Sequence, residues 1–227
     1  MSSDQSRPWA VFWDMDGTLV DTEPLWGMAT YEMSELLGRR LTPELREQTV
    51  GGPFASTLSI CAEHAGVDAD YDQWRRWMYD RMAQLMPGNV IPGPGVTELL
   101  GELDMPMLVT TNTERELADP CIDAIGRDFF SGSITGDEVP HPKPAPDMYL
   151  AAAERVGQRP QDCLVFEDSW NGMTAAAHAG CRVIGLAHKV PAGVVSMVDL
   201  QGEIGFAGVT AQTVGHWWTT LIDREEL

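Results

Sequence analysis

The sequence predicts an α/β fold, in which a parallel sheet carries helices on both faces and an all-helical domain is inserted after the first strand. Three observations predict it. A short apolar run, Ala10 to Trp13, ends in an acidic loop, as a buried strand does. Only helical patterns follow until about residue 86. From about residue 96 to residue 186, helical patterns then alternate with apolar strands.

The helical stretch after the first strand is too long for one crossover connection. Its helical patterns cover residues 23–38, 42–49, 53–65 and 70–86. We interpret it as a separate domain with hinges near residues 20–23 and 87–95, the second of which is rich in proline and glycine. We therefore expect a core of residues 1–20 and 93–227 and a helical cap domain of residues 21–92.

The rest of the chain supplies the alternating elements of the core. The predicted helices cover residues 96–103, 114–125, 146–156 and 172–179. The predicted strands cover residues 105–111, 129–134, 163–166 and 182–186. Beyond Ala187 the signal weakens, and only Val214 to Ile222, with Trp217 and Trp218, predicts a further helix docked on the core.

Composition excludes several classes of partner. The 227 residues carry a formal net charge of -19, which argues against nucleic acid and anionic membrane surfaces as partners. The N-terminus lacks the apolar segment of a secretory signal, and no apolar run reaches the roughly 18–20 residues of a membrane span. The four cysteines form no CxxC pair, as expected of buried thiols in a reducing compartment. We therefore expect a cytoplasmic protein.

Polar residues follow the first two predicted strands of the core, at the sheet edge where ligands of open parallel sheets bind. Asp14 and Asp16 lie two residues apart on the first loop, so one can act as a nucleophile while the other transfers protons. Gly17 lets this loop turn sharply. Thr111 and Asn112 follow the next strand, where a hydroxyl and backbone N–H groups can hold phosphate oxygens.

Charged residues stand in two further loops. Lys143, one of only two lysines, lies between two prolines that stiffen its backbone. Glu167 and Asp168 end another strand and offer the oxygen ligands that Mg²⁺ prefers. Each feature alone also fits a structural explanation, such as an acidic turn, a helix cap or a loop lysine. Together they supply the nucleophile, donors and cations that phosphoryl transfer requires.

The stretches DMDGTLVDTEP, LVTTN, HPKPAPDMYL and VFEDSWNGMTAAAHAG resemble the haloacid dehalogenase superfamily. The resemblance covers residues 9–190 and points to the phosphatase branch with a small helical cap, similar to phosphoglycolate phosphatases and β-phosphoglucomutases. It implies a Rossmann-like core. Two positions depart from the family pattern: Pro142 stands where many relatives carry glycine, and Trp13 is bulky for the position before the nucleophile.

The resemblance implies a role for each acidic residue. Asp14 would attack phosphorus and become an aspartyl-phosphate. Asp16 would protonate the leaving oxygen and then activate the water that hydrolyses this intermediate. Mg²⁺ would be bound by Asp14, Asp168 and the backbone carbonyl of Asp16, and Glu167 would assist.

The remaining motif residues would hold the phosphoryl group. Gly17 and Thr18 would shape the phosphate loop. Thr111 would bind the transferring phosphoryl group, with Asn112 beside it. Lys143 would bridge that group and the nucleophile.

The resemblance implies an Mg²⁺-dependent phosphatase acting on a small phosphorylated metabolite, either a sugar phosphate or a phosphoglycolate-like ester, and we expect a monomer. Dehalogenases of this superfamily usually lack an acid at the position of Asp16, and the phosphonate-cleaving branch needs a cap lysine, which residues 21–92 lack. A β-phosphoglucomutase-like mutase is the main alternative. Similar mutases carry a histidine where this chain has Trp26, and the only cap histidine here is His64. A non-catalytic binding protein on the same fold is the other alternative.

The cap is expected to cover the site and to recognise the leaving group. The candidate residues for this recognition are Glu23, Trp26, Arg46, Gly51 and Gly52. The simpler explanation for cap aromatics at helical spacing is packing within the cap. For Arg46 it is a solvated position on the surface.

Overall fold

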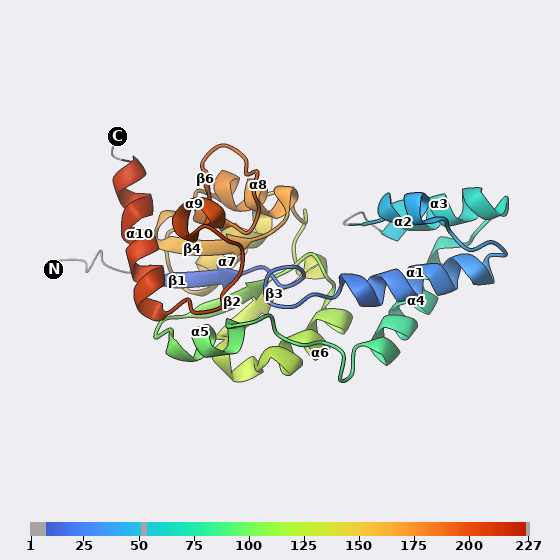
Figure 1. Cartoon of the computed structure of the whole chain (residues 1–227), viewed down its shortest axis with the longest axis horizontal. Helices are drawn as coiled ribbons and strands as arrows, with labels where there is room; N and C mark the ends of the chain where they lie inside the picture. The colour runs from blue at the N-terminus through green and yellow to red at the C-terminus, as the bar shows by residue number, and fades with distance from the viewer. Residues whose placement is uncertain (1–7, 51–53, 226–227) are drawn as a thin grey trace. The chain divides into compact units, whose positions relative to one another are not determined.

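The structure is a computed structural model that describes residues 8–50 and 54–225 (Figure 1). The chain divides into two compact units. The core unit comprises the chain up to Asp21 and from Ile91 onward, and the helical unit comprises Thr22–Val90. Two of the candidate recognition residues, Gly51 and Gly52, lie outside the described residues.

The core unit contains a six-stranded sheet in the order β3-β2-β1-β4-β5-β6, and every strand pair is parallel. The strands are β1 Ala10–Trp13, β2 Met107–Thr110, β3 Gly132–Ile134, β4 Cys163–Glu167, β5 Arg182–Gly185 and β6 Val194–Ser196. The predicted parallel α/β fold is therefore confirmed. In register, Trp13 lies opposite Val109 of β2 and Phe166 of β4, so the loops after these three strands begin at one edge of the sheet.

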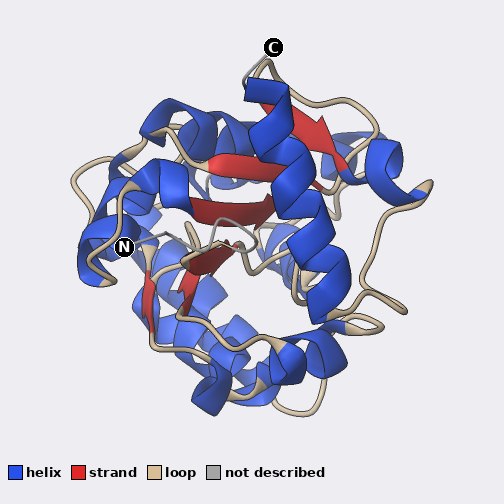
Figure 2. Ribbon diagram, turned by 90° about the vertical axis from the view of Figure 1, so that its left-hand side faces the viewer, coloured by secondary structure: helices blue, strands red, loops and turns tan. Residues whose placement is uncertain are grey.

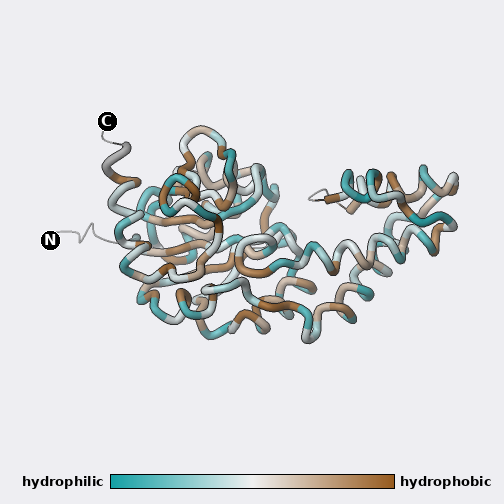
Figure 3. Tube along the Cα trace, viewed as in Figure 1, coloured by the Kyte–Doolittle hydropathy of each residue, from teal (hydrophilic) through white to brown (hydrophobic). Residues whose placement is uncertain are grey.

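Helices cover both faces of the sheet (Figure 2). Those of the core unit are α5 Val96–Glu102, α6 Arg115–Ile125, α7 Asp147–Arg155, α8 Trp170–Ala179, α9 Met197–Gln201 and α10 Ala211–Glu225. The strands are among its most hydrophobic segments (Figure 3), as expected of a parallel sheet buried on both faces.

Alternate residues of each strand reach the two faces. On one face Phe12 and Val165 pack with residues of α7 and α8, among them Tyr149 and Met173. On the other face Trp13 stacks on Phe166, with their ring centroids 4.6 Å apart. The bulk of Trp13 is thus accommodated in an aromatic layer.

The aromatic layer also holds the C-terminal helix. Trp217 and Trp218 of α10 are buried, and the Trp217 ring lies 6.3 Å from that of Phe166. The predicted docking of a helix through these tryptophans is confirmed. Strand β6 and helix α9 were not predicted, because both are short and lie beyond Ala187, where the sequence pattern weakens.

Three predicted strands are shorter than expected. The strand predicted at residues 105–111 spans only Met107–Thr110, and the one predicted at 182–186 ends at Gly185. The third difference is larger. Residues 129–134 were predicted as a strand, but Arg127–Phe129 form a 3₁₀ turn and β3 begins only at Gly132. Gly126 ends α6 with a left-handed φ of +119°, and the Phe129 ring folds back so closely that a Cβ on Gly126 would lie 2.8 Å from it. Two further 3₁₀ turns are Gly136–Glu138 and Pro160–Asp162.

The described part of the helical unit contains helices and no strand. They are α1 Glu23–Leu36, α2 Pro43–Glu47, α3 Phe54–Ala65 and α4 Tyr71–Leu85. Met33, Met78 and Met82 are fully buried between them. Glu32 and Arg81 join α1 to α4 through two hydrogen bonds of 2.5 and 2.7 Å. Among the described residues, no helix combines the length and the hydropathy needed to span a membrane.

Backbone contacts join the two segments of the core unit between which the helical unit is inserted. Val20 forms an isolated antiparallel bridge with Pro92, and the Gly93 N–H donates to the Leu19 carbonyl at 2.9 Å. The two connections to the helical unit therefore leave the core side by side.

Candidate active site

The structure brings the predicted core residues to one edge of the sheet. Asp14 follows β1, Thr111 follows β2, and Glu167 is the last residue of β4. Lys143 comes from the loop that precedes α7, and its side chain reaches back to β1 and β4. Residues separated by more than 150 positions in the sequence thus share one site.

The Lys143 ammonium group lies at the centre of this site. It donates to Asp14 Oδ1 at 2.7 Å, to Glu167 Oε1 at 2.7 Å and to the Thr110 carbonyl at 2.9 Å, so each of its three protons has an acceptor. It also lies 5.2 Å from the centroid of the Tyr149 ring. Burial alone would lower the pKa of Lys143, but the carboxylates of Asp14 and Glu167 outweigh burial and hold this pKa well above its ordinary value. Lys143 is therefore a fixed positive charge.

Asn112 fixes the backbone of Lys143. The Lys143 N–H donates to Asn112 Oδ1 at 2.9 Å, and Asn112 Nδ2 donates to the Lys143 carbonyl at 3.1 Å. This paired contact explains how the lysine loop is held against the loop after β2.

Three carboxylates crowd around Asp14. Asp14, Glu167 and Asp168 each offer one oxygen, and these atoms all lie within 4.8 Å of one another. Burial raises the pKa of Asp14 well above its ordinary value, Glu167 raises it further, and Lys143 opposes both. Burial, followed by Glu167, raises the pKa of Asp168 to about 6. One ammonium group does not offset three carboxylates, so the site has a deficit of positive charge.

This cluster fits a divalent cation. Asp14 Oδ2 is buried and has no hydrogen-bond partner, a costly arrangement unless the atom meets a cation or a ligand. All three groups offer carboxylate oxygens, which hard cations such as Mg²⁺ prefer. The Asp16 side chain does not belong to this cluster.

Two glycines let the carboxylates come this close. A Cβ on Gly17, whose φ is +88°, would lie 2.1 Å from Asp168 Oδ2. A Cβ on Gly172 would lie 1.7 Å from Glu167 Oε1. Ser169 completes the arrangement, since its N–H and hydroxyl donate to Glu167 Oε2 at 2.8 and 3.0 Å. Ser169 was not predicted, although a serine before a predicted helix is a signal for an N-cap.

Asp16 has separate partners. Its Oδ2 accepts from the Thr113 hydroxyl at 2.8 Å and from the Thr111 hydroxyl at 3.3 Å. Thr113 was not predicted, because its contact with Asp16 depends on the turn between Thr111 and Thr113 and not on any motif. Thr18 is buried, and its hydroxyl has no hydrogen-bond partner among the described residues.

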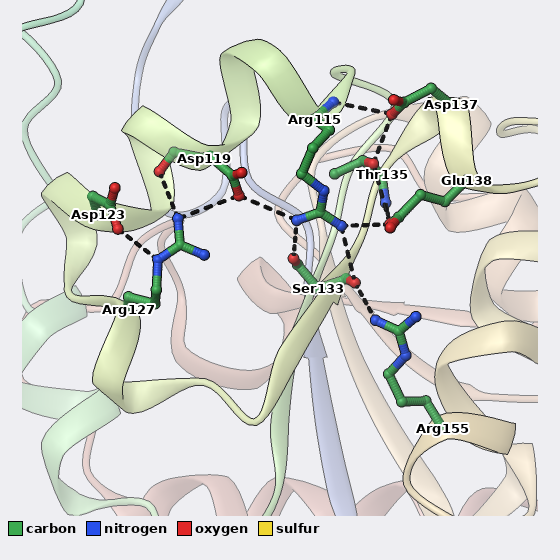
Figure 4. A network of polar contacts seen from close by, with 9 residues as sticks. All are labelled: Arg115, Asp119, Asp123, Arg127, Ser133, Thr135, Asp137, Glu138 and Arg155. Carbon is green, nitrogen blue, oxygen red and sulfur yellow. Dashed lines mark hydrogen bonds and ion pairs between the residues drawn. The ribbon is translucent and has the colours of Figure 1, made fainter.

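A polar network begins at Arg115, two residues after Thr113 (Figure 4). Arg115, at the start of α6, donates to Ser133 Oγ at 2.6 Å and to Glu138 Oε2 at 2.5 Å. The network joins α6, β3 and the 3₁₀ turn Gly136–Glu138 through Arg115, Asp119, Asp123, Arg127, Ser133, Thr135, Asp137, Glu138 and Arg155. It thereby fixes the start of α6 against β3 and this 3₁₀ turn.

Two candidate residues of the helical unit, Glu23 and Arg46, are paired with each other. Arg46 was expected to be solvated, but it is 8% exposed because its guanidinium is paired with Glu23 and donates to Thr49 Oγ1 at 2.8 Å. Trp26 is half-buried on α1. Whether Glu23, Trp26 or Arg46 contacts a substrate stays a prediction.

Comparisons of the sequence and of the structure with known proteins point to the same family. A profile described as haloacid dehalogenase-like hydrolase matches residues 10–180. The chain is 30% identical over 186 residues to a phosphorylated carbohydrates phosphatase of Thermotoga maritima, covering 80% of this chain and 86% of the relative. It is 33% identical over 188 residues to a phosphoglycolate phosphatase of Chromobacterium violaceum, covering 79% of this chain and 85% of the relative. Among solved structures, CbbY of Rhodobacter sphaeroides in complex with phosphate is similar with a TM-score of 0.72 and 27% identity, covering 85% of this chain and 94% of that one.

Proposed function

This chain belongs to the haloacid dehalogenase-like hydrolase family, in its phosphatase branch, and we propose that it hydrolyses a small phosphate monoester with Mg²⁺ through an aspartyl-phosphate on Asp14. One observation carries the proposal. Lys143 holds Asp14 Oδ1, and the buried Oδ2 has no hydrogen-bond partner. One oxygen of Asp14 lies within 4.8 Å of carboxylate oxygens of Glu167 and Asp168. A fixed lysine beside an oriented carboxylate is the arrangement that a nucleophile toward phosphorus requires.

In the first step a carboxylate oxygen of Asp14 bonds to phosphorus and the bond from phosphorus to the leaving oxygen breaks. Asp16 gives its proton to that oxygen, and the alcohol departs. Lys143 stays charged throughout and offsets negative charge on the phosphoryl oxygens. Thr111 has a hydroxyl that can donate to the same oxygens.

In the second step water attacks phosphorus and gives one proton to the Asp16 carboxylate. The bond between phosphorus and Asp14 breaks, which releases inorganic phosphate and restores the Asp14 carboxylate. Asp16 ends the cycle protonated, ready for the next leaving group. The separate hydrogen-bond partners of Asp16 support this division of roles between the two aspartates.

Asp14, Asp168 and the backbone carbonyl of Asp16 would hold Mg²⁺, with Glu167 assisting. A bound Mg²⁺ supplies positive charge that favours the ionised form of Asp14 and offsets charge on the phosphoryl group. The raised pKa values of Asp14 and Asp168 support this assignment, since burial, followed by the neighbouring Glu167 carboxylate, raises both and a bound cation would offset both effects.

The substrate class is the finer part of the proposal. The names of the phosphatases of Thermotoga maritima and Chromobacterium violaceum support a sugar phosphate or phosphoglycolate. A mutase is less well supported, because α1 carries Trp26 and no histidine. The cap histidine, His64, contacts the Arg40 carbonyl at 3.2 Å within the helical unit.

Phosphate release from a panel of sugar phosphates and phosphoglycolate, with Mg²⁺ and then with EDTA, tests the proposal. We expect release that requires the metal. The Asp14→Asn variant should be inactive yet folded, whereas Asp199→Asn, which removes an exposed acid on α9, should retain activity. No release from folded wild-type protein would refute the proposal, and net formation of glucose 6-phosphate from β-glucose 1-phosphate would indicate the mutase.

A further inference from the structure

Thr113 donates a hydrogen bond to Asp16 but lies outside every predicted motif. We propose that Thr113 is a positioning residue that orients the Asp16 carboxyl group for proton transfer to the leaving oxygen. This inference rests on the proposed function, because it assigns Asp16 the role of acid and base. It deepens that function by adding a residue that need not touch the substrate.

Thr113 is the nearer of the two hydroxyl donors to Asp16. Its Oγ1 lies 2.8 Å from Asp16 Oδ2, at the usual distance for such a bond, whereas Thr111 Oγ1 lies 3.3 Å away. Asp16 is half-buried at this position. Of these two hydroxyl groups, Thr113 therefore makes the larger contribution to the orientation of the Asp16 carboxyl group.

Thr111 has a competing task. It is expected to donate its hydroxyl proton to the transferring phosphoryl group, and a hydroxyl has only one proton to donate. When Thr111 donates to phosphate, its contact with Asp16 is lost and Thr113 remains as a donor. The need for Thr113 is thus greatest when the substrate is bound.

The contact can persist through both chemical steps. Oδ2 accepts a hydrogen bond both in the carboxylate and as the carbonyl oxygen of the protonated acid. The proton that Asp16 exchanges can therefore move on and off the group while Thr113 continues to donate.

Thr113 is itself held firmly on both sides. Its N–H donates to Thr111 Oγ1 at 3.0 Å, and its carbonyl accepts from the Gly136 N–H at 3.3 Å. Gly136 also passes close to Asn112, the residue before Thr113, since a Cβ on Gly136 would lie 2.3 Å from the Asn112 carbonyl oxygen. Gly136 also begins the 3₁₀ turn that Thr135 caps, so the donor rests on a fixed turn.

The test compares Thr113→Val, which keeps the shape but removes the donor, with Thr113→Ser, which keeps the donor. Each variant is assayed on a sugar phosphate, whose leaving alcohol needs a proton, and on 4-nitrophenyl phosphate, whose leaving group departs without one. For Thr113→Val we expect kcat/KM on the sugar phosphate to fall about 10- to 100-fold, the range for a misplaced acid–base group, with little change on 4-nitrophenyl phosphate. Thr113→Ser should restore the activity on the sugar phosphate.

A uniform loss on both esters would overturn the inference, because it would mean general damage to the site. Unchanged activity of Thr113→Val on the sugar phosphate would overturn it as well. Both results leave the proposed function standing, since wild-type protein would still release phosphate. An inactive wild-type protein would instead refute the proposed function and the inference with it. Thermal unfolding checks that the Val variant is folded, and a Thr113→Ala variant, which also lacks the donor, should show the same selective loss.

Discussion

Replacing Lys143 with methionine should destabilise the protein strongly when no metal is present. Methionine has a similar length but no charge, so the substitution removes all three hydrogen bonds of the ammonium group. The two carboxylates that it pairs remain in place, with Asp14 6% exposed and Glu167 fully buried. The variant therefore leaves two buried carboxylates without the cation that pairs with them.

The size of the effect follows from this burial. Removing one partner of a buried ion pair costs about 3–5 kcal/mol. For a protein of this size each kcal/mol lowers the unfolding temperature by about 2–4 °C, so a fall of roughly 6–20 °C is expected. The difference in unfolding temperature between the wild-type protein and Lys143→Met should shrink as the pH is lowered, because protonation of the two carboxylates removes their unpaired charges.

Circular dichroism in EDTA measures the unfolding temperature, and the chain provides a matched control. Lys189, the only other lysine, is exposed on a loop, so Lys189→Met should unfold at the wild-type temperature. The reasoning would be refuted if Lys143→Met also unfolded at that temperature. It would equally be refuted if both lysine variants lost the same stability.

Three further predictions concern other parts of the core unit and the buried thiols. Gly172→Ala should lower both stability and phosphatase activity, because its Cβ would lie 1.7 Å from Glu167 Oε1; Gly101→Ala, whose Cβ meets nothing closer than 3.9 Å, should be neutral or stabilising by about 0.5–1 kcal/mol. In EDTA the unfolding temperature should rise as the pH falls through about 6, because the folded state then binds a proton at Asp168 that the unfolded state does not, and Asp168→Asn should weaken this rise. Burial raises the pKa of Cys61 to about 11 and all four cysteines are buried, so a thiol reagent should label them rapidly only after unfolding; rapid labelling of native protein would contradict this burial.

The sequence was sufficient to predict the elements that position the site. Apolar runs such as Ala10 to Trp13 and Cys163 to Phe166 end in polar residues, and this pattern locates the functional edge of a parallel sheet without further information. The motif residues Asp14, Thr111 and Lys143 lie together because each follows or faces such a strand end.

Other features could not be predicted because they depend on side-chain pairing in three dimensions. Arg46 looked like a surface arginine, and only the fold places Glu23 and Thr49 where they allow its burial. Thr113 had no periodicity or motif to distinguish it, and its role follows from one turn of the backbone. Strand β6 was missed because its three residues lie beyond Ala187, where the alternation of helical and strand patterns no longer marks them.

The closure of the core unit where Val20 meets Pro92 has an evolutionary consequence. Because both connections leave the core side by side, the catalytic framework does not depend on what is inserted between them. An insert of different length or sequence needs only to begin and end at neighbouring points, and the entropy cost of a longer insert grows only slowly with its length. Selection can therefore exchange the segment between residues 21 and 91 for a different insert while the core loop that carries Asp14 is inherited unchanged.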